Sequence, residues 1–207
     1  MEFFFSHHDS TTPKTRDVVL ELLKDEKKDS VLDAGAGAGI LSRMLSEAEF
    51  KVMACDINPE RFQTKGVKCD KVDLSERIPY KNDRFNHVML IDVIEHLENP
   101  WNALRELNRI LKKDGTVIIS TPNVLHITYR IAVLLTGKTP GFYYGDYESN
   151  RHITPIPLWN LERMLSEAGF KIEKVTFNQG YIPKIRLGLP FKNLLLGQSL
   201  IVKARKI

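Results

Sequence analysis

Three glycines alternate with alanines directly after a short apolar stretch that ends in an acid. The run from Val31 to Ile40 reads Val-Leu-Asp-Ala-Gly-Ala-Gly-Ala-Gly-Ile, and its acid is Asp33. Glycines between a strand and a helix leave no side chains in the way, so backbone N–H groups and the helix N-terminus can approach a ligand closely. The run therefore predicts a ligand-binding loop, with glycines at Gly35, Gly37 and Gly39.

The spacing of these glycines indicates what kind of ligand the loop suits. A dinucleotide-binding loop has the pattern G-x-G-x-x-G, whereas this loop is G-x-G-x-G with Ile40 in the place of the last glycine. The carboxylate of Asp33 would repel a pyrophosphate, but it suits a cationic ligand that carries an amino group and a sulfonium. We therefore favour such a ligand over a nicotinamide dinucleotide; the remaining alternative is a glycine-rich turn without a ligand.

A second acid, Asp56, ends the next apolar stretch and lies 17 residues after Gly39. The end of a second strand is where a nucleoside ribose lies, and one carboxylate can accept hydrogen bonds from both vicinal hydroxyls. The following Ile57 would then pack on the adenine ring. The alternative is a loop aspartate that caps the next helix.

Titratable side chains gather at two further places. Asp92, Glu95 and His96 follow the apolar stretch 88–91, and His152 follows a stretch rich in tyrosine and glycine. Side chains of these types can take a proton from a reacting group. Equally, Glu95 and His96 could only cap and orient the next helix, and His152 could bond to the backbone of the preceding loop.

The glycine loop, together with Asp56, Asp73 and the run from Asp92 to Pro100, resembles the motifs of class I S-adenosylmethionine (SAM) dependent methyltransferases. The resemblance covers most of the chain, from about 31 to 206, and its middle part is similar to the methyltransferase type 11 group, which includes quinone-biosynthesis methyltransferases. It implies SAM as the cofactor, S-adenosylhomocysteine as the product, and a small-molecule acceptor of the methyl group.

The resemblance also implies roles for individual positions. In the family, an aspartate at the place of Asp73 accepts from the adenine N6, the next backbone N–H bonds to N1, and the end of the fourth strand borders the methionine moiety. The implied cofactor-binding residues share a place at strand ends: Asp33, Gly35, Ala36, Gly37, Gly39, Asp56, Ile57, Asp73, Leu74 and Ile91.

A neutral hydroxyl acceptor would need a base. The candidates for catalysis are Asp92, Glu95, His96 and His152, and His152 is favoured because it follows the aromatic insertion. We expect no metal ligands, since the pair His7-His8 has no cysteine or carboxylate at a suitable spacing.

The second half of the chain carries a different resemblance, to MetW-type proteins linked to methionine biosynthesis. The similar stretches are 121–130, 134–140, 151–152 and 193–200. A MetW-type chain would bind SAM as a regulatory or scaffold protein and act through a partner enzyme. Because this chain keeps Glu95 and His96, where MetW-type proteins depart from the methyltransferase pattern, we expect an enzyme and keep the MetW type as the alternative.

Alternating strands and helices must position these residues. Five strand–helix alternations predict a parallel sheet covered on both faces, and two closing strands without a helix between them predict one antiparallel edge strand. The predicted fold is α/β: a Rossmann-like, seven-stranded, mostly parallel sheet in one domain over 1–207, with an N-terminal arm over 1–14 and a substrate-shaping insertion over 121–154. The expected strands are 30–33, 51–56, 67–72, 88–91, 116–120, 170–177 and 198–204, with 178–196 irregular.

Length and composition exclude several classes of protein. The 207 residues suffice for one sizeable core. No stretch has the ~20 consecutive apolar residues of a membrane span, and no secretory signal pattern is present. The two cysteines, Cys55 and Cys69, indicate a reducing cytoplasm, and a net charge of +4 from dispersed basic residues does not predict nucleic-acid binding. The oligomeric state, the methyl acceptor and its reacting atom stay open.

Overall fold

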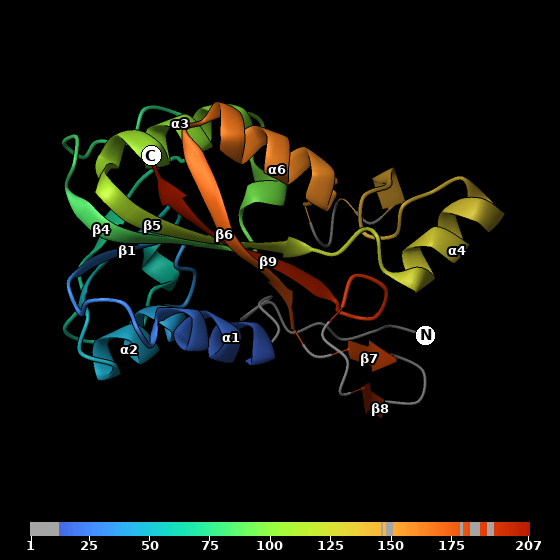
Figure 1. Cartoon of the computed structure of the whole chain (residues 1–207), viewed down its shortest axis with the longest axis horizontal. Coiled ribbons are helices and arrows are strands. Elements are labelled where there is room, and N and C mark those ends of the chain that lie inside the picture. Colours follow the sequence, from blue (N-terminus) through green and yellow to red (C-terminus); the bar gives the residue numbers. More distant parts are fainter. Residues whose placement is uncertain (1–12, 146, 148–150, 179, 183–186, 190–192) are drawn as a thin grey trace.

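Seven strands form a single sheet in the order β3-β2-β1-β4-β5-β9-β6 (Figure 1). The computed structural model describes residues 13–145, 147, 151–178, 180–182, 187–189 and 193–207. Neighbouring strands from β3 to β5 run parallel, and β9 runs antiparallel to both β5 and β6. The predicted mostly parallel sheet with one antiparallel strand is confirmed, although that strand lies inside the sheet and β6 forms the edge. The strands are β1 (Ser30–Ala34), β2 (Lys51–Asp56), β3 (Cys69–Lys71), β4 (Phe85–Ile91), β5 (Leu111–Pro122), β6 (Phe170–Phe177) and β9 (Ser199–Lys206).

Helices cover the sheet on both faces, because its central strands bury apolar side chains on both sides. On β4, Val88 and Leu90 pack in one core with α3 and α6, while Met89 and Ile91 pack in a second core with α1 and α2. Figure 1 shows the two helix layers on opposite sides of the sheet. The covering helices are α1 (Pro13–Leu23), α2 (Ile40–Glu47), α3 (Pro100–Ile110) and α6 (Leu158–Glu167).

Three further elements lie where strands lead into the next part of the chain. The 3₁₀ turns η1 (Pro59–Arg61) and η2 (Ile94–His96) follow β2 and β4, and helix α4 (Ile127–Thr136) begins the insertion after β5. In Figure 1, α4 lies well away from the sheet, and none of its residues is buried. Among the described residues, no helix combines the length and the apolar character needed to cross a membrane.

The structure differs from the sequence prediction in the bounds of three strands and in one added hairpin. Strand β3 has only three residues, β4 begins at Phe85, and β5 begins at Leu111, because Asp114-Gly115 is an irregularity within that strand, where the register against β4 shifts. The stretch predicted as irregular contains a short hairpin of β7 (Gly180–Ile182) and β8 (Leu187–Leu189). Its glycines weaken the alternation by which a strand is recognised.

The predicted arm over 1–14 falls almost entirely on residues 1–12, outside the described residues. The arm and the substrate-shaping role of 121–154 stay predictions.

Candidate functional site

The glycine loop joins β1 to α2 and is fastened to the end of β2. The backbone N–H groups of Gly35 and Ala36 both donate to the Cys55 carbonyl, at 2.8 and 3.0 Å. Gly39 precedes α2 and its N–H donates to the Ala36 carbonyl at 2.8 Å. The loop is therefore held in place by backbone bonds.

Gly35 and Gly37 have different surroundings. Gly35 has φ +78°, and a Cβ added to it would lie 2.4 Å from Cγ2 of Val93, so the loop can pack against the segment after β4 only without a side chain here. Gly37 has φ +53°, and an added Cβ would meet no atom within 4 Å. The backbone at Gly37 therefore borders open space, where a ligand can approach it closely.

Asp56 connects the tips of β1 and β2. Its Oδ2 accepts from the backbone N–H of Gly37 and its Oδ1 from that of Asn58, both at 2.8 Å. A carboxylate offers about four lone-pair sites, so two of them stay available for the hydroxyls of a ligand. The neighbouring Ile57 is 64% exposed, an unusual place for an isoleucine and suited to cover an apolar ring.

Asp33 lies beneath the glycine loop. Its side chain is buried, and its Oδ2 accepts from the Ser42 hydroxyl of α2 at 2.6 Å. Burial, with a smaller contribution from the charge of Asp56, raises the pKa of this carboxyl to about 6, although the hydrogen bonds from Ser42 oppose the shift. At neutral pH Asp33 thus holds a negative charge under the loop, and it is bonded to α2.

The remaining predicted cofactor residues divide into one exposed side chain and two buried ones. Asp73 is exposed, and its Oδ1 accepts from the backbone N–H of Ser75 at 2.8 Å. The side chains of Leu74 and Ile91 belong to the two cores. A contact of these two residues with a cofactor would therefore involve their backbone atoms.

Asp92 follows β4 directly and has an unusual backbone. Its φ of 54° lies in the left-handed region, which is sparsely populated by residues other than glycine and is enriched at functional sites. The side chain is tied to β5, because the Ser120 hydroxyl donates to Asp92 Oδ1 at 2.6 Å. The backbone N–H of Asp92 lies 3.0 Å from Ser120 Oγ and 3.1 Å from its carbonyl oxygen.

Three titratable side chains, Glu95, His96 and His152, form a cluster beyond the end of β4. One potential ligand atom from each lies within 4.8 Å of the others. The two imidazole rings are 4.8 Å apart, and the Phe142 ring lies 5.0 Å from that of His152. The structure thus brings together three of the four predicted catalytic residues, while Asp92 is held by Ser120 instead.

Glu95 is the buried member of this cluster, with 1% of its surface exposed. Its Oε2 accepts no hydrogen bond from any residue that the structure describes. Burial raises the pKa of Glu95 well above its ordinary value, and the charge of Asp92 adds to the shift, while the Thr121 hydroxyl opposes it.

His96 has a defined tautomer. Its Nδ1 lies 3.0 Å from the Arg151 carbonyl oxygen. Because a carbonyl can only accept, Nδ1 carries the proton, and in the neutral ring Nε2 keeps a free electron pair. Burial lowers the pKa of His96, with the bond to Arg151 opposing, so the neutral ring is favoured.

Backbone bonds hold the end of the insertion against this cluster. The N–H groups of Ile153 and Thr154 both donate to the Glu95 carbonyl, at 2.9 and 3.1 Å, and that of Arg151 donates to the Tyr147 carbonyl at 2.8 Å. These bonds bring His152 to the tip of β4.

Two residues that position the site were not predicted from the sequence: Ser42, which bonds Asp33, and Ser120, which bonds Asp92. Ser42 follows Ile40 and Leu41, and Ser120 follows Ile118 and Ile119, so a hydroxyl residue directly after an apolar pair is the available signal in the sequence.

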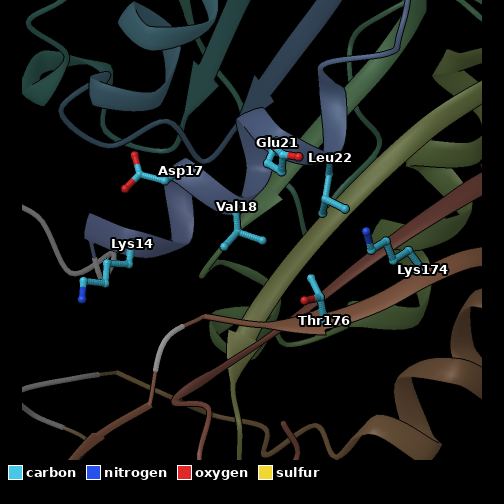
Figure 2. Close-up of a pocket in the computed structure, with 7 residues that line it drawn as sticks. All are labelled: Lys14, Asp17, Val18, Glu21, Leu22, Lys174 and Thr176. Atoms are coloured by element: carbon cyan, nitrogen blue, oxygen red, sulfur yellow. The ribbon is translucent and has the colours of Figure 1, made fainter. Parts of the chain in front are cut away.

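A hollow of about 560 Å³ lies elsewhere, between α1 and the edge strand β6 (Figure 2). None of the predicted site residues lines it, and its charged side chains carry both signs. We therefore do not assign the candidate site to it. Its lining residues are Lys14, Asp17, Val18, Glu21, Leu22, Lys174 and Thr176.

Comparisons with known proteins agree with this geometry. A family model described as a methyltransferase domain matches residues 6–175. A ubiquinone biosynthesis O-methyltransferase of Rickettsia canadensis is 24% identical over 159 residues, which cover 73% of this chain and 66% of that protein.

Two solved structures share the fold. A SAM-dependent methyltransferase of Thermotoga maritima, described as a possible histamine N-methyltransferase, has a TM-score of 0.71 at 20% identity, over 94% of this chain and 88% of that one. A 1,6-didemethyltoxoflavin N1-methyltransferase of Burkholderia thailandensis, solved with its substrate and S-adenosylhomocysteine, has a TM-score of 0.61 at 19% identity, over 92% and 76%.

Proposed function

Because the chain belongs to the SAM-dependent methyltransferase family, we propose that it transfers the methyl group of SAM to a small-molecule acceptor. One observation carries the proposal. The glycine loop, Asp56 and the Glu95–His96–His152 cluster follow the carboxyl ends of β1, β2 and β4, which are neighbours in the sheet. Ligands of open α/β sheets bind beyond these strand ends. The residues suited to bind SAM and the side chains suited to accept a proton therefore lie at the same edge of the sheet.

The residues at the tips of β1 and β2 fit the cofactor. The free lone pairs of Asp56 would receive the ribose hydroxyls, the exposed Ile57 would cover the adenine, and the open backbone at Gly37 would allow close approach. The buried charge of Asp33 favours the cationic groups of SAM without direct contact, since its carboxylate is bonded to Ser42. We keep Asp73 and the backbone of Leu74 as the contacts of the adenine edge. When bound, SAM supplies an electrophilic methyl group on a positively charged sulfur.

The cluster beyond β4 would act on the acceptor. Holding the acceptor in line with the methyl group can supply about 7–11 kcal/mol of the barrier reduction. A hydroxyl acceptor also has to lose its proton, and Glu95, His96 and His152 are the titratable groups that lie together beside Asp92. Because the Rickettsia relative is named as an O-methyltransferase, phenols and other hydroxyl compounds are the first acceptors to test. That His152 itself takes the proton stays a prediction.

The experiment uses SAM labelled in its methyl group and a panel of phenols, other alcohols, amines and a metabolite extract. We expect label to pass to a product from the panel with this chain, and to fail with an Asp56→Ala variant. Calorimetric titration with SAM accompanies the assay. A chain that binds SAM but never releases its methyl group would contradict the proposal and support the MetW-type alternative; a chain that does not bind SAM would contradict both.

A further inference from the structure

We propose that Glu95, His96 and His152 bind one divalent transition-metal cation. The sequence predicted no metal ligands, because this set of side chains exists only in three dimensions: His152 comes from the far end of the insertion and meets η2 through the fold. The proposal concerns the acceptor side of the proposed active site. The use of the cation in methyl transfer rests on the proposed function, whereas the binding of the cation does not.

The buried carboxylate is the first reason to expect a cation. Glu95 is 1% exposed, and its Oε2 receives no hydrogen bond from the described residues. Buried carboxyl groups in proteins are normally paired, hydrogen-bonded or bound to a metal, because leaving them without a partner is costly. No donor among the described residues reaches this oxygen, whereas one ring nitrogen from each of His96 and His152 lies within 4.8 Å of a carboxylate oxygen of Glu95.

The second reason is the way in which His96 is held. Metal-binding histidines commonly donate their other ring N–H to a carbonyl or a carboxylate, which fixes the tautomer and aims the free nitrogen at the metal. The Nδ1–H of His96 donates to the Arg151 carbonyl at 3.0 Å. The lone pair of Nε2 is therefore free to serve as a ligand.

The third reason is that His152 is placed by the same contact. The carbonyl that fixes His96 belongs to the residue before His152, and the two residues after it donate to the Glu95 carbonyl. One short backbone segment thus positions both imidazoles relative to Glu95. Such an arrangement keeps three potential ligands together before any cation binds.

The donor set indicates the class of cation. Two imidazole nitrogens and one carboxylate oxygen suit Zn²⁺, Mn²⁺ or Fe²⁺, whereas Mg²⁺ and Ca²⁺ prefer oxygen ligands. Ligand atoms about 2.1 Å from one tetrahedral cation are roughly 3.4 Å apart. Since the present separations reach 4.8 Å, the side chains need to close by up to about 1.4 Å. Three protein ligands leave a coordination position for an acceptor that presents a hydroxyl oxygen.

The test measures cation binding without SAM or acceptor. All proteins carry His7→Ala and His8→Ala, because two histidines that are consecutive in the sequence could bind Zn²⁺ by themselves. Mn²⁺ binding is followed by the loss of the free-ion electron paramagnetic resonance signal, and Zn²⁺ binding by calorimetry. We expect one site per chain, and at least about tenfold weaker binding in Glu95→Gln and in His152→Gln.

Two matched variants serve as controls. Glu98→Gln removes an exposed acid three residues further along, and His126→Asn replaces a histidine that caps α4 with another capping residue. We expect cation binding by both to equal that of the parent protein. SAM binding by all four variants shows that each is folded, since none of the four is among the predicted cofactor-binding residues.

The outcomes separate this inference from the proposed function. The absence of saturable Mn²⁺ or Zn²⁺ binding, or binding that survives both Glu95→Gln and His152→Gln, would overturn the cation site even if methyl transfer proceeds. Methyl transfer at full rate in the presence of a strong chelator would overturn the use of the cation. Failure of SAM to bind or to donate its methyl group would overturn the proposed function and leave the binding result standing.

Discussion

The buried charge of Asp33 should make the stability of this protein fall as pH rises. Burial raises the pKa of its carboxyl from 3.8 to about 6, so the folded chain holds a proton that the unfolded chain releases. For a raised pKa, the stabilisation is complete below the unfolded value and is lost as pH rises through the folded value. The window is therefore about pH 4 to 6, and above it the ionised carboxylate makes the fold less stable.

The size of the effect follows from the shift. At about 1.36 kcal/mol per pKa unit, the Asp33 contribution to the free energy of unfolding should decrease by about 2 kcal/mol between pH 4 and pH 7.5. An Asp33→Asn variant removes this contribution and alters the Ser42 bond in a pH-independent way. The free energy of unfolding of the variant minus that of the parent should therefore increase by about 2 kcal/mol between pH 4 and pH 7.5.

The assay is urea denaturation of both proteins at half-unit steps of pH. Taking the difference between proteins cancels the titration of all other groups. A difference that stays flat from pH 4 to pH 7.5 would refute the reasoning.

The same charge should govern SAM affinity, because a cationic ligand favours ionised Asp33. SAM should bind more tightly as pH rises through about 6, and Asp33→Asn should lose this dependence. Removing this charge should therefore weaken SAM binding by Asp33→Asn at pH 7.5, measured by calorimetric titration against the parent protein.

Three other substitutions test the elements of the site. Gly35→Ala should lower the free energy of unfolding by about 3 kcal/mol or more in denaturant titrations, because the new Cβ overlaps Val93 and the backbone has a left-handed φ. Gly66 has the same φ of 78° and open surroundings, so Gly66→Ala should lower it by only about 1–2 kcal/mol. Asp56→Ala should weaken SAM binding by about 10- to 100-fold in calorimetry, since it removes charge-assisted hydrogen bonds to the ribose. Ser120→Ala should lower the free energy of unfolding by about 1–2 kcal/mol and also reduce turnover, because it releases the carboxylate of Asp92; unchanged turnover would separate Asp92 from the reaction.

Local signals made the cofactor side of the site predictable. The bounds of β2 match the predicted 51–56, because its apolar residues end in an acid and a proline follows shortly after. The glycines at 35, 37 and 39 all have positive φ, as expected of a turn that only glycine makes easily. The family resemblance then linked Asp56 and Asp73 to a nucleoside; in the structure Asp56 is the last residue of β2 and Asp73 lies two residues after β3.

The partners of the buried acids could not be predicted, because they depend on which elements meet in three dimensions. Ser42 reaches Asp33 from α2, and Ser120 reaches Asp92 from β5, the neighbour of β4 in the sheet. The pKa of Asp33 follows from this burial and not from its neighbours in the chain. The MetW-type resemblance stays a prediction, since the methyltransferase comparisons do not test it.

The site has two sides that are built in different ways. On the cofactor side, backbone bonds between two neighbouring strand tips hold the loop after β1, such as those from Gly35 and Ala36 to Cys55 of β2. On the acceptor side, the geometry depends on the end of the insertion, which reaches back to the Glu95 carbonyl and carries His152 with it. A change in the length of 121–154 would move His152 and Phe142 relative to Glu95 while leaving the β1 loop intact. We therefore expect the identity of the acceptor to be determined by the insertion, and the use of SAM by the strand tips.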